Sequence, residues 1–257
     1  MTTFDFQDGK GPVPAHQHPN GGGWVADTAY VTNTAYVEQH ARVYGNAEVY
    51  DYAKIYDSAM VYGNARIFDN VEIYGSAFVT GNACIYDRAI ICNKALISEN
   101  VRVCNNARIS GGVLAYGHAA VYGDAGVHDF AHLFGYAEVY GNAQVFEGAQ
   151  VFDCAQVFEN AKISGYAKVY GSAKVFGNAQ VFDTAKIYGD AEICMSHLVS
   201  GNMQLDANSA RAFRLAYTAD KKTAKISYKD YPHLYPKCKS PAYVGFVKID
   251  CSNNCGV

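Results

Sequence analysis

Residues 41–58 read ARVYGN-AEVYDY-AKIYDS and show the six-residue repeat from which the fold can be predicted. Each unit of six begins with Ala, has an aliphatic residue two positions later, continues with Tyr and ends in a pair that starts with Gly or Asp. Every sixth residue from Ala29 to Ala191 gives 28 positions, of which 25 are Ala and the other three are Val. Because this phase never shifts, no loop is inserted anywhere in the stretch.

Each unit predicts a short strand followed by a tight corner. Side chains alternate along a strand, so the Ala and the aliphatic residue share one face, and the polar residue and the Tyr share the other. The Gly, Asp and Asn residues of the corners tolerate a positive φ. A period of six drifts out of phase with an α-helix. The strands therefore have to stack as a solenoid that buries Ala and Val between neighbouring coils.

The spacing from Val43 to Ala47, Val49 to Ala53 and Val139 to Ala143 resembles the hexapeptide repeat of left-handed parallel β-helix proteins. The resemblance implies an all-β fold with three hexapeptides per triangular coil and about nine coils, and in many members a homotrimer. Relatives of this kind in bacteria and phages are often labelled transferases by analogy of fold, which is a weak basis for a function.

The chain is expected to have three parts. Residues 1–28 precede the repeat and would form an N-terminal cap or loop, and the β-helix would span residues 29–197. Residues 198–257 leave the six-residue phase and carry nine Lys and Arg against four Asp. This last part is expected to be a small basic extension with α+β or irregular structure.

Composition excludes several classes of protein. Lys and Arg number 21 against 24 Asp and Glu, a net charge of -3, so no general attraction to duplex nucleic acid is expected. No apolar run reaches the roughly 18 residues of a membrane helix, and the first ten residues lack a secretory signal. Eight Cys are too few for a disulfide scaffold. These features predict a cytoplasmic protein with reduced thiols and no membrane contact.

The residue after each aliphatic position is aromatic at 18 of 28 positions. Rings in one column would lie about 4.8 Å apart on successive coils and stack. We interpret these ladders as a means of stabilising the fold; binding of a ligand by stacking is the alternative.

One outward column is apolar in four consecutive coils. It consists of Met60, Phe78, Leu96 and Leu114. The aromatic ladder beside it is interrupted by the small residues Thr80 and Ser98. An exposed apolar stripe of this size usually marks a contact surface. We expect a subunit contact in a trimer, or the C-terminal segment, to bury it.

Two groups of residues are candidates for ligand binding. In the segment HQHPNGGGW, Trp24 is expected to cap the open first coil; in the alternative, the segment is a ligand loop in which His16, His18 and Asn20 supply polar contacts and Trp24 a stacking face. In the repeat, His128 and His132 flank a corner with Asp129 between them. The aromatic residues and the basic C-terminal part suit a small anionic, nucleotide-like ligand, held in grooves between subunits or at an end.

The leading hypothesis is a non-catalytic, trimeric binding protein that needs no cofactor. Resemblance to hexapeptide acyltransferases implies an alternative in which a His acts as general base and acetyl-CoA is the cofactor. His132 is the best candidate for that base, with His128 second, but no extruded loop supplies the wall of a cleft. A third alternative is a structural rod in a larger assembly.

Four residues of the C-terminal part are candidates for a metal site. His233, Cys238, Cys251 and Cys255 are residue types that bind zinc, although their spacing is less specific than paired CxxC motifs. Reduced structural thiols are the preferred interpretation of these cysteines.

Overall fold

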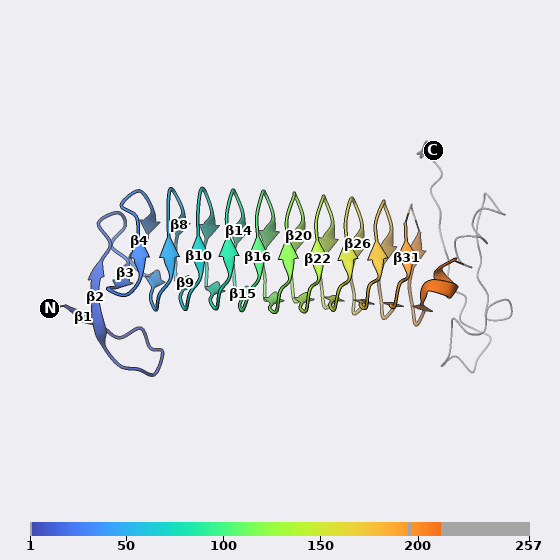
Figure 1. Cartoon of the computed structure of the whole chain (residues 1–257), viewed down its shortest axis with the longest axis horizontal. Helices are drawn as coiled ribbons and strands as arrows, with labels where there is room; N and C mark the ends of the chain where they lie inside the picture. Colours follow the sequence, from blue (N-terminus) through green and yellow to red (C-terminus); the bar gives the residue numbers. More distant parts are fainter. Residues whose placement is uncertain (1, 195–196, 212–257) are drawn as a thin grey trace.

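The computed structural model describes residues 2–194 and 197–211. The chain winds into a straight, left-handed parallel β-helix with three sides (Figure 1). Strands pair with the residue 18 positions away, as Phe78 does with Met60 on one side and with Leu96 on the other. One coil therefore contains three hexapeptides, as the repeat predicts.

Each side of the rod is one sheet. The first sheet has 13 strands and is called the long sheet: β1 (Thr3–Phe4), β2 (Val13–Gln17), β3 (Trp24–Ala26), β6 (Arg42–Val43), β9 (Met60–Val61), β12 (Phe78–Val79), β15 (Leu96–Ile97), β18 (Leu114–Ala115), β21 (His132–Leu133), β24 (Gln150–Val151), β27 (Lys168–Val169), β30 (Lys186–Ile187) and β33 (Gln204–Leu205). The second sheet has 10: β4 (Tyr30–Val31), β7 (Glu48–Val49), β10 (Arg66–Ile67), β13 (Cys84–Ile85), β16 (Arg102–Val103), β19 (Ala120–Val121), β22 (Glu138–Val139), β25 (Gln156–Val157), β28 (Lys174–Val175) and β31 (Glu192–Ile193). The third sheet also has 10: β5 (Tyr36–Val37), β8 (Lys54–Ile55), β11 (Glu72–Ile73), β14 (Ile90–Ile91), β17 (Arg108–Ile109), β20 (Gly126–Val127), β23 (Gln144–Val145), β26 (Lys162–Ile163), β29 (Gln180–Val181) and β32 (Leu198–Val199).

The core consists of small and aliphatic side chains that point into the tube from all three sheets. From residue 35 to residue 193, the Ala column and the aliphatic column are 0% exposed. Where the aliphatic column holds Ala115 instead, its neighbour one coil on is the larger Leu133. Each buried Val or Ile contributes about 1.5–3 kcal/mol by leaving water. The inward orientation predicted for these two columns is confirmed.

The corners are held by side chains as well as by backbone. Asp87 has a φ of 62°, and its carboxylate accepts a hydrogen bond at 2.9 Å from the backbone N–H of Asn105, one coil further on. Glu147 and Glu159 accept in the same way from Gly165 and Gly177. An acidic residue at this left-handed position therefore offsets its backbone strain with a charge-assisted hydrogen bond.

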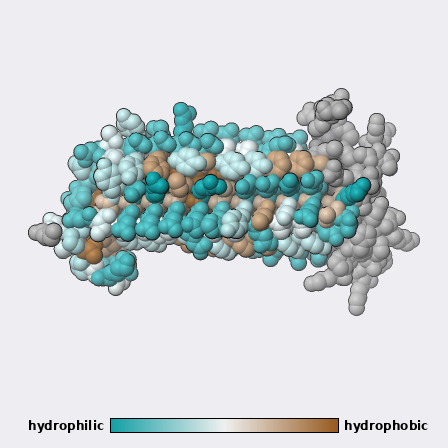
Figure 2. Space-filling model, in the orientation of Figure 1, coloured by the Kyte–Doolittle hydropathy of each residue, from teal (hydrophilic) through white to brown (hydrophobic). Residues whose placement is uncertain are grey.

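Side chains of one kind line up along the rod, and rows of similar hydropathy follow its length (Figure 2). The predicted aromatic ladders are present. Tyr44 and Tyr62 stack at 4.8 Å between ring centroids, and Phe152 stacks on Phe134 at 4.6 Å and on Tyr170 at 4.9 Å. A second ladder is polar: the Asn46 side chain donates to Asn64, Asn64 to Asn82 and Asn82 to Asn100.

The solenoid extends beyond residues 29–197 at both ends. It begins at β3 and ends at β33, and the second and third sheets contain 10 strands each, so there are about ten coils instead of nine. The hexapeptides at the two ends keep the inward phase with Gly23, His197 and Met203 in place of Ala, and all three are buried. The Ala count misses these three hexapeptides because the tube accepts other residues where it ends. Residues 207–211 are helical. In the described part of the chain, no helix is long and apolar enough to cross a membrane.

Candidate functional site

Residues 2–23 precede β3, and we call them the N-terminal segment. The part that contains Phe4 and Phe6 folds back over the outer face of the long sheet. Strands β1 and β2 are antiparallel, and β2 pairs with β3 at the start of the rod. Phe6 is 2% exposed and stacks on Tyr44 at 4.8 Å, while Phe4 stacks on Trp24 at 4.4 Å with 14° between the rings. This packing was not predicted from the sequence. The alternation of Phe4, Asp5 and Phe6 is the signal that could have revealed it, since in an extended segment the two rings lie on the same side.

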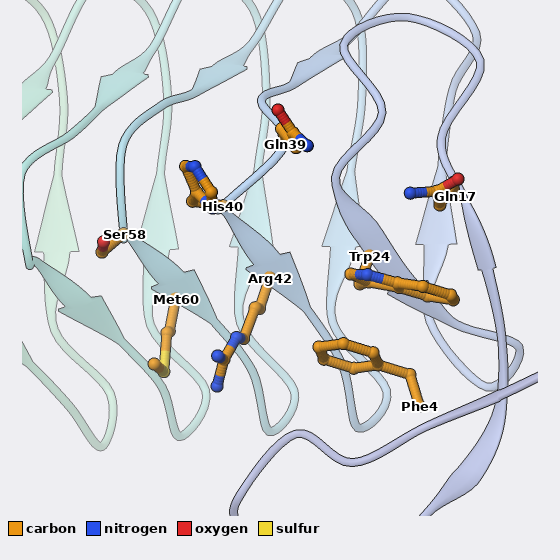
Figure 3. Close-up of a pocket in the computed structure, with 8 residues that line it drawn as sticks. All are labelled: Phe4, Gln17, Trp24, Gln39, His40, Arg42, Ser58 and Met60. Carbon is orange, nitrogen blue, oxygen red and sulfur yellow. The ribbon is translucent and has the colours of Figure 1, made fainter.

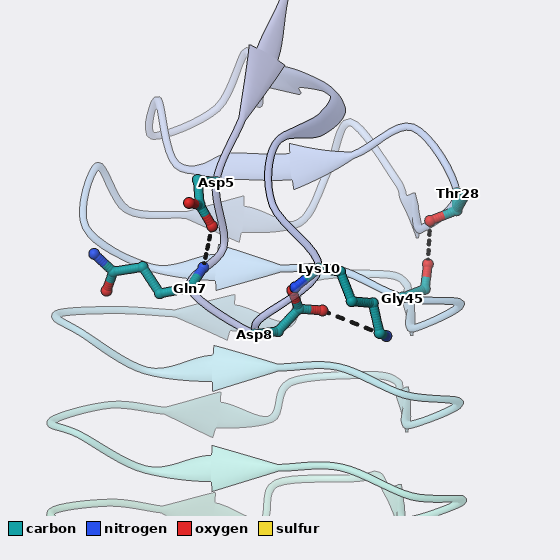
Figure 4. A network of polar contacts seen from close by, with 6 residues as sticks. All are labelled: Asp5, Gln7, Asp8, Lys10, Thr28 and Gly45. Atoms are coloured by element: carbon teal, nitrogen blue, oxygen red, sulfur yellow. Dashed lines mark hydrogen bonds and ion pairs between the residues drawn. The ribbon is translucent and has the colours of Figure 1, made fainter.

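Polar contacts anchor the same segment. Nη1 of Arg42 donates to the Phe6 carbonyl and to Oε1 of Gln7, both at 3.3 Å, and the guanidinium lies 5.5 Å from the centroid of the Phe4 ring. The turn that follows is closed by Asp5 and Asp8, which accept from the N–H groups of Gln7 and Lys10 (Figure 4). The segment is therefore an ordered wall on the rod.

A hollow of about 320 Å³ opens beside this wall (Figure 3). Its floor follows the pairing of β2, β3, β6 and β9, which places Gln17, Trp24, Arg42 and Met60 side by side on the outer face. The opposite side is formed by residues from the equivalent corners of two adjacent coils. The complete lining is Phe4, Gln17, Trp24, Gln39, His40, Arg42, Ser58 and Met60. We call this hollow the N-terminal groove.

Tyr44 lies under the N-terminal segment and titrates abnormally. Burial raises the pKa of Tyr44 from 10.0 to about 12, with Tyr62 and Asp8 acting in the same direction and Arg42 against it. The folded state thus disfavours the phenolate. The neutral Tyr44 phenol therefore contributes fully to the free energy of unfolding below pH 10, and this contribution is lost as the pH rises through about 12.

We therefore expect alkaline pH to release the N-terminal segment before the rod unfolds. Ionised Tyr44 cannot remain stacked beneath Phe6 without a desolvation cost, so attachment should weaken between pH 10 and about 12. Release of the segment is measured by following phenolate absorbance and Trp24 emission together. In Tyr44→Phe the segment should stay attached to a higher pH. Release at the same pH in both proteins would contradict this assignment.

Of the four residues proposed for the ligand loop, two make contacts within the fold instead. His18 is 2% exposed; its Nε2 donates to the Thr32 carbonyl at 3.2 Å, and its Nδ1 accepts from the Asn20 N–H at 3.3 Å. The Asn20 side chain donates to the Ala35 carbonyl at 2.9 Å. The hydrogen bonds of His18 and Asn20 thus hold the N-terminal segment against the first coil. His16 is exposed and pairs with Asp27.

Trp24 does not cap the open coil, because it lies on the outer face of β3 while the adjacent Val25 points into the core with 0% exposure. The loop from residue 18 to residue 23 covers the first coil instead. Gly23 donates to the Val37 carbonyl at 2.9 Å. A Cβ on Gly21, which has a φ of +112°, would lie 2.3 Å from the same oxygen, so only Gly allows this approach.

The two histidines of the repeat lie on different sides of the rod. His128 follows β20 in the third sheet, where it stacks on Phe146 at 5.0 Å and Nδ1 lies 3.1 Å from Oδ2 of Asp129. His132 belongs to β21 in the long sheet, between Leu114 and Gln150. Asp129 therefore orients His128, the less favoured candidate base, and gives His132 no such support.

The four apolar residues of the long sheet form a continuous, half-buried column across β9, β12, β15 and β18. Met60 packs with the aromatic cluster around Phe6. The N-terminal segment therefore covers the start of the stripe, whereas we expected a trimer contact or the C-terminal segment there. Phe78, Leu96 and Leu114 continue beyond it.

The proposed zinc ligands His233, Cys238, Cys251 and Cys255 lie outside the described residues, as does the chain beyond residue 211. Within residues 2–194 and 197–211, no group of three or more His, Cys, Asp or Glu side chains could hold a metal ion.

The fold defines the class: this chain is a left-handed parallel β-helix built from hexapeptide repeats. No protein-family model and no curated protein matches the sequence. Among solved structures it is similar to LpxA from Acinetobacter baumannii, with a TM-score of 0.48 and 15% sequence identity, over 88% of this chain and 99% of LpxA.

Proposed function

We propose that this protein is a non-catalytic β-solenoid that associates into a homotrimer and binds a small polar ligand. The observation that carries the proposal is the outer face of the long sheet, where Phe78, Leu96 and Leu114 lie in consecutive strands just beyond the N-terminal segment. The neighbouring ladder holds Thr80 and Ser98 instead of rings, so a second chain can approach closely. In a cyclic trimer, each chain would bring this face to a contact with the next chain around the threefold axis.

The regular walls of the rod favour binding over catalysis. A general base needs an acceptor within hydrogen-bond distance and a cleft that holds it. His132 stands in a column of side chains on the long sheet, and neither of its neighbours in that column, Leu114 and Gln150, carries a carboxylate that would orient its imidazole and stabilise its protonated form. The N-terminal groove provides walls on two sides and is the better place for a ligand.

The test is the mass of the assembly in solution, measured by light scattering. The unmodified protein should have the mass of three chains, and the double variant Phe78→Glu, Leu96→Glu should have that of one, because two carboxylates per chain would lose water in the contact. The matched control adds two carboxylates to the third sheet, with Gln144→Glu and Gln180→Glu, and should remain trimeric. Circular dichroism would establish that all variants are folded.

Two results would contradict the proposal. A monomeric unmodified protein would exclude the trimer and favour a rod that functions alone or in a mixed assembly. Turnover of acetyl-CoA that disappears in His132→Ala would exclude the non-catalytic role and favour the acyltransferase alternative.

A further inference from the structure

The N-terminal groove combines one flat aromatic surface with several uncharged polar side chains. From this combination we infer that it binds a neutral saccharide, with one sugar ring packed on Trp24. The inference rests on the binding role proposed for this protein and does not require the trimer. It specifies both the site and the chemical class of the ligand.

The aromatic surface is held rigidly in place. Phe4 stacks against one face of the indole at 4.4 Å and 14°. Figure 3 shows the other side of Trp24 directed toward the space bordered by Gln17 and Gln39, two residues that line the same hollow. A sugar ring presents C–H groups on one side, and these pack well on the flat, electron-rich face of an indole. Because Trp24 is already fixed by Phe4, little side-chain entropy is lost on binding.

The polar side chains suit hydroxyl groups. Gln17, Gln39 and Ser58 each carry both a donor and an acceptor, and so does the neutral imidazole of His40. A sugar hydroxyl likewise donates and accepts, so each contact can be satisfied in either direction. Gln17, Gln39 and His40 are exposed, so their hydrogen-bonding groups are available to a ligand.

The charge of the groove argues against the anionic, nucleotide-like ligand expected from the sequence. Arg42 is the one permanently charged residue among the eight that line the hollow. Its Nη1 already donates to the Phe6 carbonyl and to Gln7, and its guanidinium lies over the Phe4 ring. Arg42 thus holds the wall of the groove, and no Lys or second Arg lines the hollow to pair with a phosphate group. A neutral ligand needs none.

The experiment uses Trp24 as its own reporter, because it is the only Trp in the chain. Trp emission of the full-length protein is followed while neutral oligosaccharides of glucose, mannose, galactose, xylose and N-acetylglucosamine are added separately to millimolar concentrations. At least one series should change the emission in a saturable way. Gln39→Ala should weaken that binding about fivefold or more, since one hydrogen bond is lost. Gln150→Ala, which alters an outward Gln of the long sheet distant from the groove, should bind as the unmodified protein does.

Three results would overturn the inference: no saturable change with any oligosaccharide, equal weakening in Gln39→Ala and Gln150→Ala, or saturable binding of nucleosides or nucleotides in place of sugars. The mass of each sample is measured in parallel. A trimer that binds no sugar would leave the association proposed above intact, and a monomer that binds sugar would exclude only the trimer. The two ideas therefore fail separately.

Discussion

Replacing Ile91 with Ala should lower the free energy of unfolding around the middle coils by about 2–5 kcal/mol. Ile91 is 0% exposed and lies between Ile73 and Ile109 on the neighbouring strands of the third sheet. Strands on both sides fix the spacing of the coils, so the walls cannot collapse into the cavity left by the missing atoms. The loss is measured by hydrogen exchange of the amides of β11, β14 and β17, because a solenoid can open locally without unfolding as a whole.

The control is its neighbour on the same strand. Ile90 points outward and is half-buried, so Ile90→Ala removes the same atoms from a site that water already reaches. Its effect should be clearly smaller. Equal losses for the two variants would mean that β14 does not separate an inner from an outer face.

Replacing Phe6 with Ala should detach the N-terminal segment at a cost of about 3–5 kcal/mol. Phe6 is 2% exposed, stacks on Tyr44 and belongs to the cluster that includes Met60. Hydrogen-exchange protection should be lost in β1 and in the residues around Phe6. The coils beyond β9 should keep their protection, since each coil makes most of its contacts with the coils next to it.

The matched control for this variant is Phe130→Ala. Phe130 is 70% exposed on a corner, and its truncation should change stability by no more than about 0.5 kcal/mol. If β1 stays protected in Phe6→Ala, contacts other than the stacking on Tyr44 hold the segment in place.

The repeat could be predicted because it is local. Each Ala and each aliphatic residue meets the same environment every six positions, so one hexapeptide predicts the next. The corner pattern follows as well: Gly alternates with Asp, Asn or Glu because the position has a positive φ, as at Asp87 and Gly81. At the two ends this reasoning fails, since Gly23, His197 and Met203 replace Ala without leaving the tube.

The candidate site could be predicted only in part. The apolar stripe does face outward, as predicted, but Trp24 does not cap the first coil, and His18 and Asn20 instead hold the N-terminal segment against that coil. Their backbone partners, Thr32 and Ala35, are 14 and 15 residues away in the sequence. No periodicity relates these residues, because they belong to a segment that crosses the end of the rod.

The six-residue period is enough to predict the solenoid: its coil of three hexapeptides, its inward Ala and Val columns and its stacked aromatic ladders, all of which depend on contacts between equivalent positions of adjacent coils. The position of the N-terminal segment, the part of the apolar stripe that it covers and the groove beside Trp24 became known from the folded chain alone. The reason is that this segment packs by single, non-repeating contacts, such as Phe4 on Trp24 and Phe6 on Tyr44. Such contacts depend on the path of the chain in space and leave no period in the sequence.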